Sequence, residues 1–223
     1  MSDPKQKLTP TEIREAGLQD WRQLLSGIRA RFKTGDFATG LALVDRIGAA
    51  AEEANHHPDI FLTYPEVIVT LASHDVGGIT SRDLDLARQI SGFAAEAGVK
   101  ADIEGLTQLE PGLDTADGKR LAPFYAALLG GEVQDGEPVD ASGQVPTLWF
   151  QEPGGGGPEL PESAVPQRWH FDVWVPFEAA ESRIQAALDA GGTMVSDAAA
   201  PSFWVLEDAD GNRSCICTMA ERD

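Results

Sequence analysis

Several features that define whole classes of protein are scarce in this sequence. Its 223 residues include only two cysteines, Cys215 and Cys217, which stand two positions apart. Cysteines this close cannot join distant parts of a fold, so we interpret them as reduced thiols and exclude a disulfide-stabilised secreted module. No apolar run approaches the roughly 18 residues that a transmembrane helix needs. The opening MSDPKQKLTP lacks the apolar stretch of a signal peptide, and we therefore expect a cytoplasmic protein.

Positive charge is also in short supply. Seventeen Lys and Arg residues stand against 36 Asp and Glu residues, which gives a formal net charge of −19. Nucleic acids and anionic lipids repel a polyanion, so we expect neither nucleic acid nor a membrane as a partner. The hydrophobic share of 42% is ordinary for a globular protein with a real core. Composition therefore favours an acidic enzyme of one or two domains.

A change of sequence texture near residues 98–103 divides the chain into two predicted domains, 1–98 and 102–223. The first combines three helices with a small antiparallel sheet. Thr9, Asp36 and Thr80 are residue types that cap helix N-termini, and apolar residues recur at helical spacing after Asp36 and Thr80. The expected strands are 28–33, 59–63 and 66–73, and the last two form a hairpin. This pattern predicts an α+β fold with the helices on one face of the sheet.

The helix after Asp36 is the longest one predicted. Its apolar residues at helical spacing are Phe37, Leu41, Val44 and Ile47. This spacing, which an alanine run continues to Ala54, predicts the helix, and Asn55 is a residue type that suits its C-terminal end.

The second predicted domain has an internal repeat. Its pattern predicts the order strand, helix, strand, strand, strand twice in succession, with each copy about fifty residues long. The expected segments are strand 103–110, helix 118–129 and strands up to Phe150, then strand 168–175, helix 177–190 and strands 193–195, 202–206 and 214–219. The run Gly154–Gly157 lacks the Lys, Ser or Thr of a phosphate-binding loop, so we interpret it as the linker between the copies.

Three of the four histidines lie between positions 56 and 74. His56 and His57 follow a predicted helix, and His74 follows the second strand of the predicted hairpin. Glu52 lies four residues before His56, so a helix would place its carboxylate beside that imidazole. Imidazoles exchange protons near neutral pH, which favours a cluster for acid–base catalysis. Two other interpretations stay open, because three histidines could hold zinc and each could be structural.

Two motifs surround these histidines. One is EEANHHPD at residues 52–59, and the other is VTLASHDVGGIT at residues 69–80, followed by Asp83. Together they resemble the pterin-4a-carbinolamine dehydratase family over roughly residues 8–97. The match is specific because two separated motifs agree in order and spacing. Ile60 departs from the pattern, since the family commonly has tryptophan there, which could loosen one wall of the pterin pocket.

The resemblance implies dehydration of 4a-hydroxytetrahydropterin to quinonoid dihydropterin, a hydro-lyase reaction that recycles a pterin cofactor. It implies that His56 and His74 act as acid and base without a metal, that His57 binds the pterin and that Glu52 holds His56. The residues implied to line the pocket are Pro58, Ser73, Asp75 and Val76. No cofactor is implied, because the pterin is the substrate. Relatives form dimers or tetramers, which implies a homo-oligomer unless the second domain blocks that interface.

Three stretches of the second domain, at residues 122–130, 168–173 and 206–212, resemble the glyoxalase-like branch of the vicinal oxygen chelate superfamily, whose plan is the doubled unit. Enzymatic members hold a divalent metal with His, Glu or Gln side chains. By position the weak candidates are Glu110, Gln151, His170 and Cys215, and an acid is usual where Cys215 stands. The alternative is that His170 hydrogen-bonds inside the cleft and Cys215 is a small apolar strand residue.

Three hypotheses follow. The leading one is a pterin carbinolamine dehydratase fused to a glyoxalase-like domain. The second is a metal-dependent glyoxalase-like or dioxygenase-like enzyme in the C-terminal domain. The third is a non-catalytic dimerisation or interaction module, because members of the first family can also act as dimerisation partners.

Overall fold

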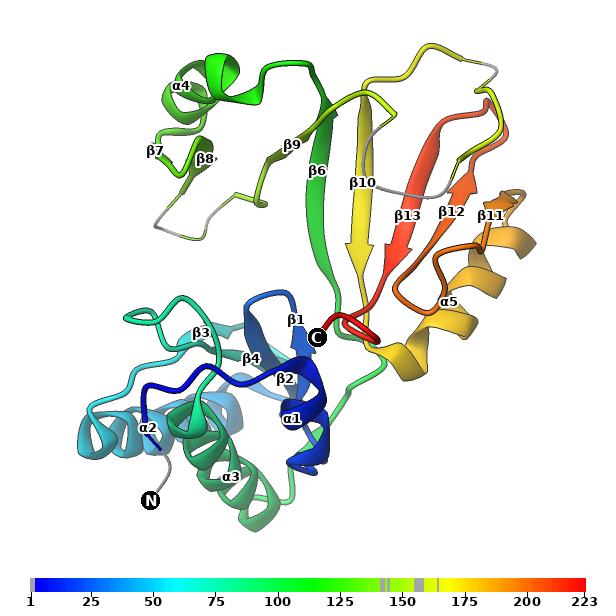
Figure 1. Cartoon of the computed structure of the whole chain (residues 1–223). Helices are drawn as coiled ribbons and strands as arrows, with labels where there is room; N and C mark the ends of the chain where they lie inside the picture. Colours follow the sequence, from blue (N-terminus) through cyan, green and yellow to red (C-terminus); the bar gives the residue numbers. More distant parts are fainter. Residues whose placement is uncertain (1–2, 141–142, 144, 155–158, 164) are drawn as a thin grey trace. The chain divides into compact units, whose positions relative to one another are not determined.

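The computed structural model describes residues 3–140, 143, 145–154, 159–163 and 165–223. The chain folds as two compact units (Figure 1). One consists of the residues up to Leu106 together with Met219–Asp223, and the other is Thr107–Thr218. From position 155 onward, the predicted Gly154–Gly157 linker lies outside the described residues. Within those described ranges, no helix is both long and apolar enough to cross a membrane.

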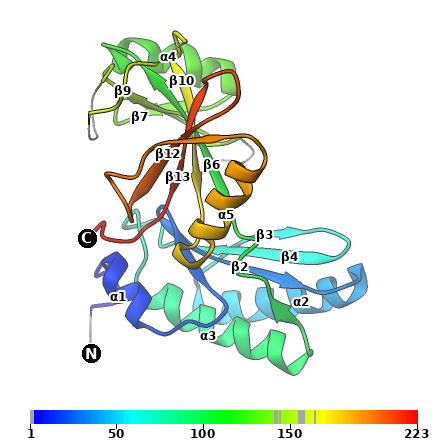
Figure 2. The ribbon, with the colours of Figure 1, turned by 90° about the vertical axis from the view of Figure 1, so that its right-hand side faces the viewer.

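The first unit places its helices on one face of an antiparallel sheet, as the sequence predicted (Figure 2). The strands are β1 (Arg22–Leu24), β2 (Gly27–Lys33), β3 (Asp59–Leu62), β4 (Glu66–Leu71) and β5 (Lys100–Ala101), in the order β1-β2-β4-β3 with β5 also paired to β2. The helices are α1 (Pro10–Glu15), α2 (Phe37–Ala54) and α3 (Ser81–Glu96).

The helix ends follow the predicted capping residues. Thr9 and Thr80 form capping boxes, in which each side chain and the acidic residue three positions later satisfy each other's backbone N–H groups. Asp36 accepts a hydrogen bond from the Thr39 backbone at the start of α2. Asn55 ends α2 in the left-handed conformation, with φ of 47°.

The core of the first unit lies between the sheet and helices α2 and α3. The buried strand residues are Ile28, Ala30, Phe32, Val67, Val69 and Leu71. The buried residues of α2 are Gly40, Leu43, Ile47, Ala50 and Ala51. The helix lies close to the sheet at Gly40, where a Cβ atom would lie 2.7 Å from Leu62 Cδ1. Phe37 and Leu41 lie on the outer side of the helix, where they are 47% and 45% exposed.

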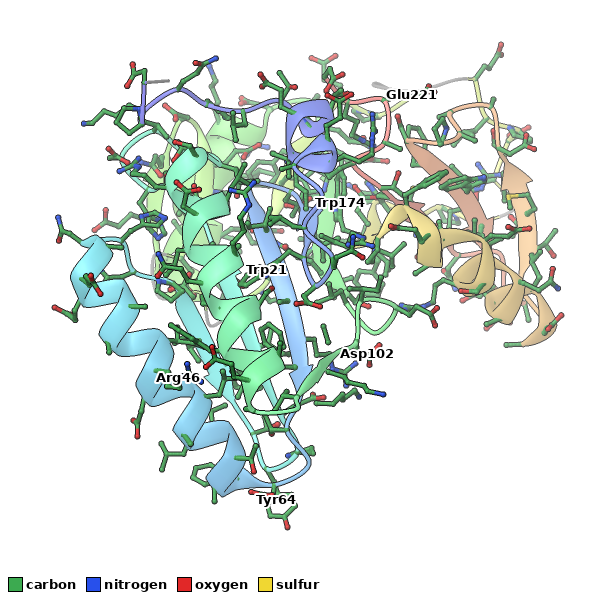
Figure 3. All side chains as sticks on the ribbon, turned by 90° about the horizontal axis from the view of Figure 1, so that it is seen from below. Trp21, Arg46, Tyr64, Asp102, Trp174 and Glu221 are labelled. Atoms are coloured by element: carbon green, nitrogen blue, oxygen red, sulfur yellow. The ribbon has the colours of Figure 1, made fainter. Side chains whose placement is uncertain are left out.

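Helices α2 and α3 are joined at their surface as well. Arg46 on α2 donates to Glu96 Oε2 at 2.6 Å, and its guanidinium carbon lies 4.2 Å from the centre of the Phe93 ring (Figure 3). Trp21 is buried, and its indole N–H donates to Ser91 Oγ of α3 at 3.0 Å. These contacts hold α3 in place over the sheet, which positions the residues at its N-terminus.

An ion-pair cluster ties the segment after β5 to the sheet. Arg31 Nε donates to Glu66 Oε2 at 2.8 Å, and Lys33 Nζ lies 3.1 Å from Asp102 Oδ2. The hydrogen bond from Arg31 is the largest of the effects that lower the pKa of Glu66 below its usual value. Because the folded pKa lies below the unfolded one, this stabilisation is complete above the unfolded pKa of Glu66 and is lost as the pH falls through the folded pKa.

Replacing Glu66 by Gln should therefore destabilise the first unit by about 1–2 kcal/mol at neutral pH, because Arg31 loses its charged acceptor. The measurement is amide hydrogen exchange of β2 and β4, which reports this unit alone. The difference from wild type should shrink as the pH falls through the lowered pKa of Glu66, because the wild-type carboxylate then protonates as well. Glu53→Gln, at an exposed position of α2, is the control. An effect of Glu66→Gln that does not change with pH would contradict the prediction.

The second unit has the predicted doubled order. The first copy contains β6 (Gln108–Asp114), α4 (Gly118–Leu129), β7 (Glu132–Gln134), β8 (Glu137–Val139) and β9 (Trp149–Gln151). The second contains β10 (Trp169–Trp174), α5 (Phe177–Asp189), β11 (Thr193–Ser196), β12 (Phe203–Glu207) and β13 (Arg213–Cys217). The predicted strand 103–110 begins five residues late, because residues 103–107 lie in the connection between β5 and β6.

The pairing of these strands shows the internal symmetry. In each copy the first strand pairs in parallel with the last, as β6 with β9 and β10 with β13. The two first strands, β6 and β10, pair antiparallel at the centre of a sheet of order β11-β12-β13-β10-β6-β9. Strands β7 and β8 form a separate hairpin. Helix α5 packs on one face of the main sheet through Ala180 and Ile184, which leaves the other face for the candidate ligands.

Candidate active site

The β3–β4 hairpin brings the predicted histidines to one end of the first unit. Asp59 at the start of β3 pairs with Thr70, near the end of β4. His56 and His57 lead into β3, whereas His74 follows β4. Because the strands are antiparallel, the residues before one and after the other lie at the same end of the hairpin.

A buried polar network connects these two segments. His56 Nε2 lies 2.7 Å from Asp83 Oδ1, and Ser73 Oγ donates to Asp83 Oδ2, also at 2.7 Å. The Thr80 hydroxyl lies 2.9 Å from Ser73 Oγ, and the Thr80 backbone N–H donates to Asp83 Oδ2 at 2.7 Å. Asp83 is fully buried and His56 is 7% exposed. A buried carboxylate is tolerated only when it is hydrogen-bonded, and here each oxygen has a partner.

Asp83 performs two tasks in this arrangement. As the third residue of α3, it completes the capping box with Thr80. It also binds one ring nitrogen of His56, which fixes the ring and leaves only Nδ1 to meet another group. Our sequence interpretation placed Asp83 in the dehydratase motif and gave it no role in the site. Its position nine residues after His74 was the signal available.

The expected pairing of Glu52 with His56 is wrong. Glu52 Oε1 lies 3.1 Å from Nε2 of His57 instead. The left-handed conformation of Asn55 ends α2 before His56, so the helical relationship between positions 52 and 56 is lost. His56 turns into the core and His57 turns outward, with 56% of its side chain exposed. An exposed pair of this kind contributes little to stability.

His74 lies on an exposed turn between Ser73 and Gly78, which are joined by backbone hydrogen bonds. Asp75 in this turn accepts a hydrogen bond from Arg82 Nη2 at 2.6 Å and lies 3.3 Å from Lys5 Nζ. The Arg82 hydrogen bond is the largest of the effects that lower the pKa of Asp75. Among the described residues, the His74 imidazole has no hydrogen-bond partner, so it is available to a ligand.

The residues predicted to line the pocket fall into two groups. Pro58 and Val76 are half-buried beside the histidines in sequence and can contact a ligand. Ser73 is 1% exposed and its hydroxyl bonds inward to Asp83, so it supports the site from beneath instead of lining it. Asp75 is occupied by Arg82 and Lys5, and shapes the turn.

In the second unit, strand register places the four candidate metal ligands on one face of the sheet. Glu110 and Cys215 both pair with Asp172. His170 pairs with Gly112, and Gln151 pairs with Asp114. Paired residues project from the same side of a sheet, and this side is opposite to the one that α5 covers.

These four residues do not fit a metal site. Glu110 accepts a hydrogen bond from the Trp174 indole at 3.0 Å, and Gln151 donates to Asp114 at 2.6 Å. The His170 ring lies in the space that a side chain at position 112 would fill, with its centre 5.5 Å from that of Trp149. Across the described part of the chain, no three His, Cys, Asp or Glu side chains converge to hold an ion.

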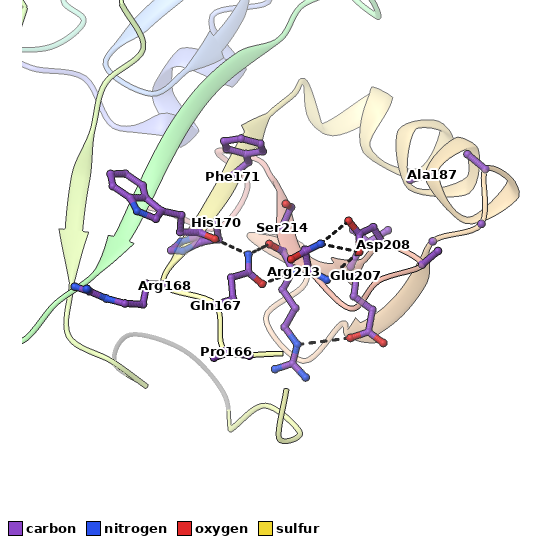
Figure 4. A pocket seen from close by; sticks show the side chains of 17 residues that line it. Pro166, Gln167, Arg168, His170, Phe171, Ala187, Glu207, Asp208, Arg213 and Ser214 are labelled. Carbon is purple, nitrogen blue, oxygen red and sulfur yellow. Dashed lines mark hydrogen bonds and ion pairs between the residues drawn. The ribbon is translucent and has the colours of Figure 1, made fainter. Parts of the chain in front are cut away.

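The second unit also has a pocket of about 830 Å³, at the ends of β10, β12 and β13 and of helix α5 (Figure 4). Trp169 and Phe171 line it and are 42% and 51% exposed. Gln167 spans its floor, where it accepts from the Arg213 backbone N–H at 2.6 Å and donates to the carbonyl groups of Trp169 and Arg213. The Gln167 amide is thus occupied by hydrogen bonds to the protein backbone.

Comparison with known proteins matches the two units to two different families. Residues 6–93 match the family model for pterin 4 alpha carbinolamine dehydratase, and residues 112–217 match the model for a glyoxalase-like domain. A protein of Thermosynechococcus vestitus with the provisional name pterin-4-alpha-carbinolamine dehydratase is 41% identical over 91 residues, which are 40% of this chain and 96% of the relative. A similarly named Nocardia farcinica protein is 46% identical over 77 residues, which are 34% of this chain and 81% of that protein.

A solved structure from Brucella melitensis, titled transcriptional coactivator/pterin dehydratase, is 34% identical, with a TM-score of 0.39. The match covers 40% of this chain and 99% of that one. Identity of about 40% over nearly the whole of the relatives is decisive for the first unit. The chain therefore belongs to the pterin-4-alpha-carbinolamine dehydratase family through its N-terminal unit, and carries a glyoxalase-like domain after it.

Proposed function

We propose that the first unit dehydrates 4a-hydroxytetrahydropterin to quinonoid dihydropterin, and that it does so with histidine acid–base chemistry. The observation that carries the proposal is the buried network in which Asp83 joins His56 to Ser73, the neighbour of His74. This network joins the two segments that carry the three histidines, residues 56–57 and 73–74, at one end of the hairpin. Family membership and the names of the relatives support the choice of substrate.

The reaction removes water, and each proton needs a carrier. The 4a-hydroxyl is a poor leaving group, so an acid must protonate its oxygen as the C–O bond breaks. A base takes a proton from the ring nitrogen system, so the ring loses a hydroxide and a proton, which together are water. An imidazole can perform either step near neutral pH, and the pterin itself needs no oxidant or reductant.

Burial and hydrogen bonding suggest how the histidines divide these tasks. His74 is exposed and its ring has no partner among the described residues, so it can approach the substrate without breaking a protein contact. His56 offers only Nδ1, because Asp83 binds Nε2. We assign the acid and base to these two residues. His57, exposed beside them, binds the pterin, and Glu52 orients His57.

The test is a direct rate measurement. 4a-Hydroxytetrahydropterin is generated in the cuvette, and its loss is followed by absorbance with and without the full-length chain. We expect the protein to accelerate dehydration, and we expect EDTA to leave that rate unchanged because imidazoles supply both proton transfers. A rate that is lost on chelation and restored by a divalent metal would favour the metal-dependent hypothesis for the second unit. No acceleration by folded protein would overturn the proposal.

A further inference from the structure

The turn that carries His74 is held from outside by the segment before α1. The Leu8 backbone N–H donates to the Ile79 carbonyl at 2.8 Å, which places the segment against the turn. Lys7 Nζ donates to the Gly77 carbonyl at 2.9 Å. A hydrogen bond from an ammonium group is stronger than one between neutral groups. Lys7 therefore binds the last part of the turn, next to Gly78, which pairs with Ser73.

Gly78 provides the space for this contact. A Cβ atom at position 78 would collide with Lys7 Cε and would lie 2.9 Å from Cδ and 3.0 Å from Cγ. Gly78 is buried, so the aliphatic stem of Lys7 covers it while the ammonium group reaches Gly77. Gly78 is not among the residues with positive φ, so the need for glycine here comes from space and not from backbone conformation.

His74 depends on the turn in a way that His56 does not. The His56 ring is fixed by Asp83, whereas the His74 ring has no hydrogen-bond partner among the residues that the structure describes. The direction of the His74 side chain is therefore set by the turn backbone. That backbone is anchored inside by Ser73, which bonds to Asp83, and outside by Lys7 at Gly77.

We propose that Lys7 is a positioning residue for His74, and that its stem and Gly78 form one clasp that sets the geometry of the turn. This inference rests on the proposed dehydratase function only where it predicts a rate. A loosened turn would spread the His74 ring over orientations that do not reach the substrate oxygen. Small displacements of a catalytic group have large effects on rate.

Three variants separate the two parts of the clasp. Lys7→Met keeps an unbranched stem and removes the ammonium group, Lys7→Arg restores a cation, and Gly78→Ala displaces the stem. We expect Lys7→Met and Gly78→Ala each to lower kcat about tenfold with little change in KM, and we expect Lys7→Arg to recover most of the loss. Because both changes open the same clasp, the double variant should be no worse than the poorer single one. Lys100→Met, an exposed lysine on β5, is the matched control and should keep the wild-type rate.

A second measurement does not depend on catalysis. Amide exchange at residues 74–78 should accelerate in Lys7→Met and Gly78→Ala but not in Lys100→Met, while exchange in β2 and β4 stays unchanged. If wild-type protein fails to dehydrate the pterin, the proposed function fails. Amide exchange at residues 74–78 then still tests whether Lys7 and Gly78 hold the turn. If amide exchange at residues 74–78 is as slow in Lys7→Met as in wild type, Lys7 does not hold the turn and the proposed clasp is wrong. Faster exchange there with wild-type kcat, or losses in the two single variants that add, would overturn the positioning role.

Discussion

Replacing His74 by alanine should slow pterin dehydration by about 10²- to 10⁴-fold, the range typical of a lost general acid or base. The fold should survive, because the side chain is exposed and makes no hydrogen bond to any described residue. The assay is the same absorbance measurement, with kcat and KM determined separately. A thermal melt that matches wild type shows that the loss is chemical.

His57→Ala provides the contrast for this variant. His57 is also exposed and lies at the same end of the hairpin, and its one partner among the described residues, Glu52, is on the surface. If it binds the pterin instead of transferring a proton, its loss should raise KM more than it lowers kcat. A His74→Ala protein that keeps a rate within about twofold of wild type would remove His74 from the acid–base pair.

Replacing Asp83 by alanine should destabilise the first unit by about 3–5 kcal/mol, the usual consequence of removing one partner from a buried charged network. His56, Ser73 and the Thr80 backbone N–H would all lose their acceptor in the core. This is a large fraction of the stability of an ordinary domain, which is about 5–15 kcal/mol. Amide exchange of α3 and of β4 measures the change in this unit.

Two further variants make the Asp83 result specific. Asp83→Asn keeps the shape and one acceptor oxygen but turns an NH₂ group toward existing donors, so we expect a smaller destabilisation of about 1–3 kcal/mol and a loss of rate. Asp85→Asn is the matched control on the same helix turn. Asp85 is exposed and, among the residues that the structure describes, pairs with Arg88 alone, so the change should stay within about 0.5 kcal/mol. Equal stability of Asp83→Ala and Asp85→Asn would show that the network does not hold the site together.

Much of the local structure could be predicted because local residues determine it. Capping residues and helical spacing located α2 and α3, and the β3–β4 hairpin followed from two strand-like runs that are close in the sequence. The repeat in the second unit was visible because each copy has the same order of periodic segments. Helical spacing alone did not distinguish the buried apolar residues of α2, such as Ile47, from the exposed Phe37 and Leu41, because packing against the sheet decides this.

The candidate site divides in the same way. Its three histidines and the likeness to the family follow from residue types and spacing, which are properties of short segments. The partners of those histidines do not. Glu52 pairs with His57 because a single left-handed residue at Asn55 ends the helix, and His56 pairs with Asp83, 27 residues away.

Order of elements, helix caps and the choice of proton-carrying side chains can thus be read from the chain, because each depends on neighbours within a few residues. Which side chain is buried, which carboxylate binds it and which lysine closes the turn depend on packing between distant segments. The Asp83 network and the Lys7 clasp exist because α3 and the segment before α1 meet the end of the β3–β4 hairpin in space. The spacing of residues along the chain does not predict these contacts, because hydrogen bonds between distant segments form only once the core has brought the segments together.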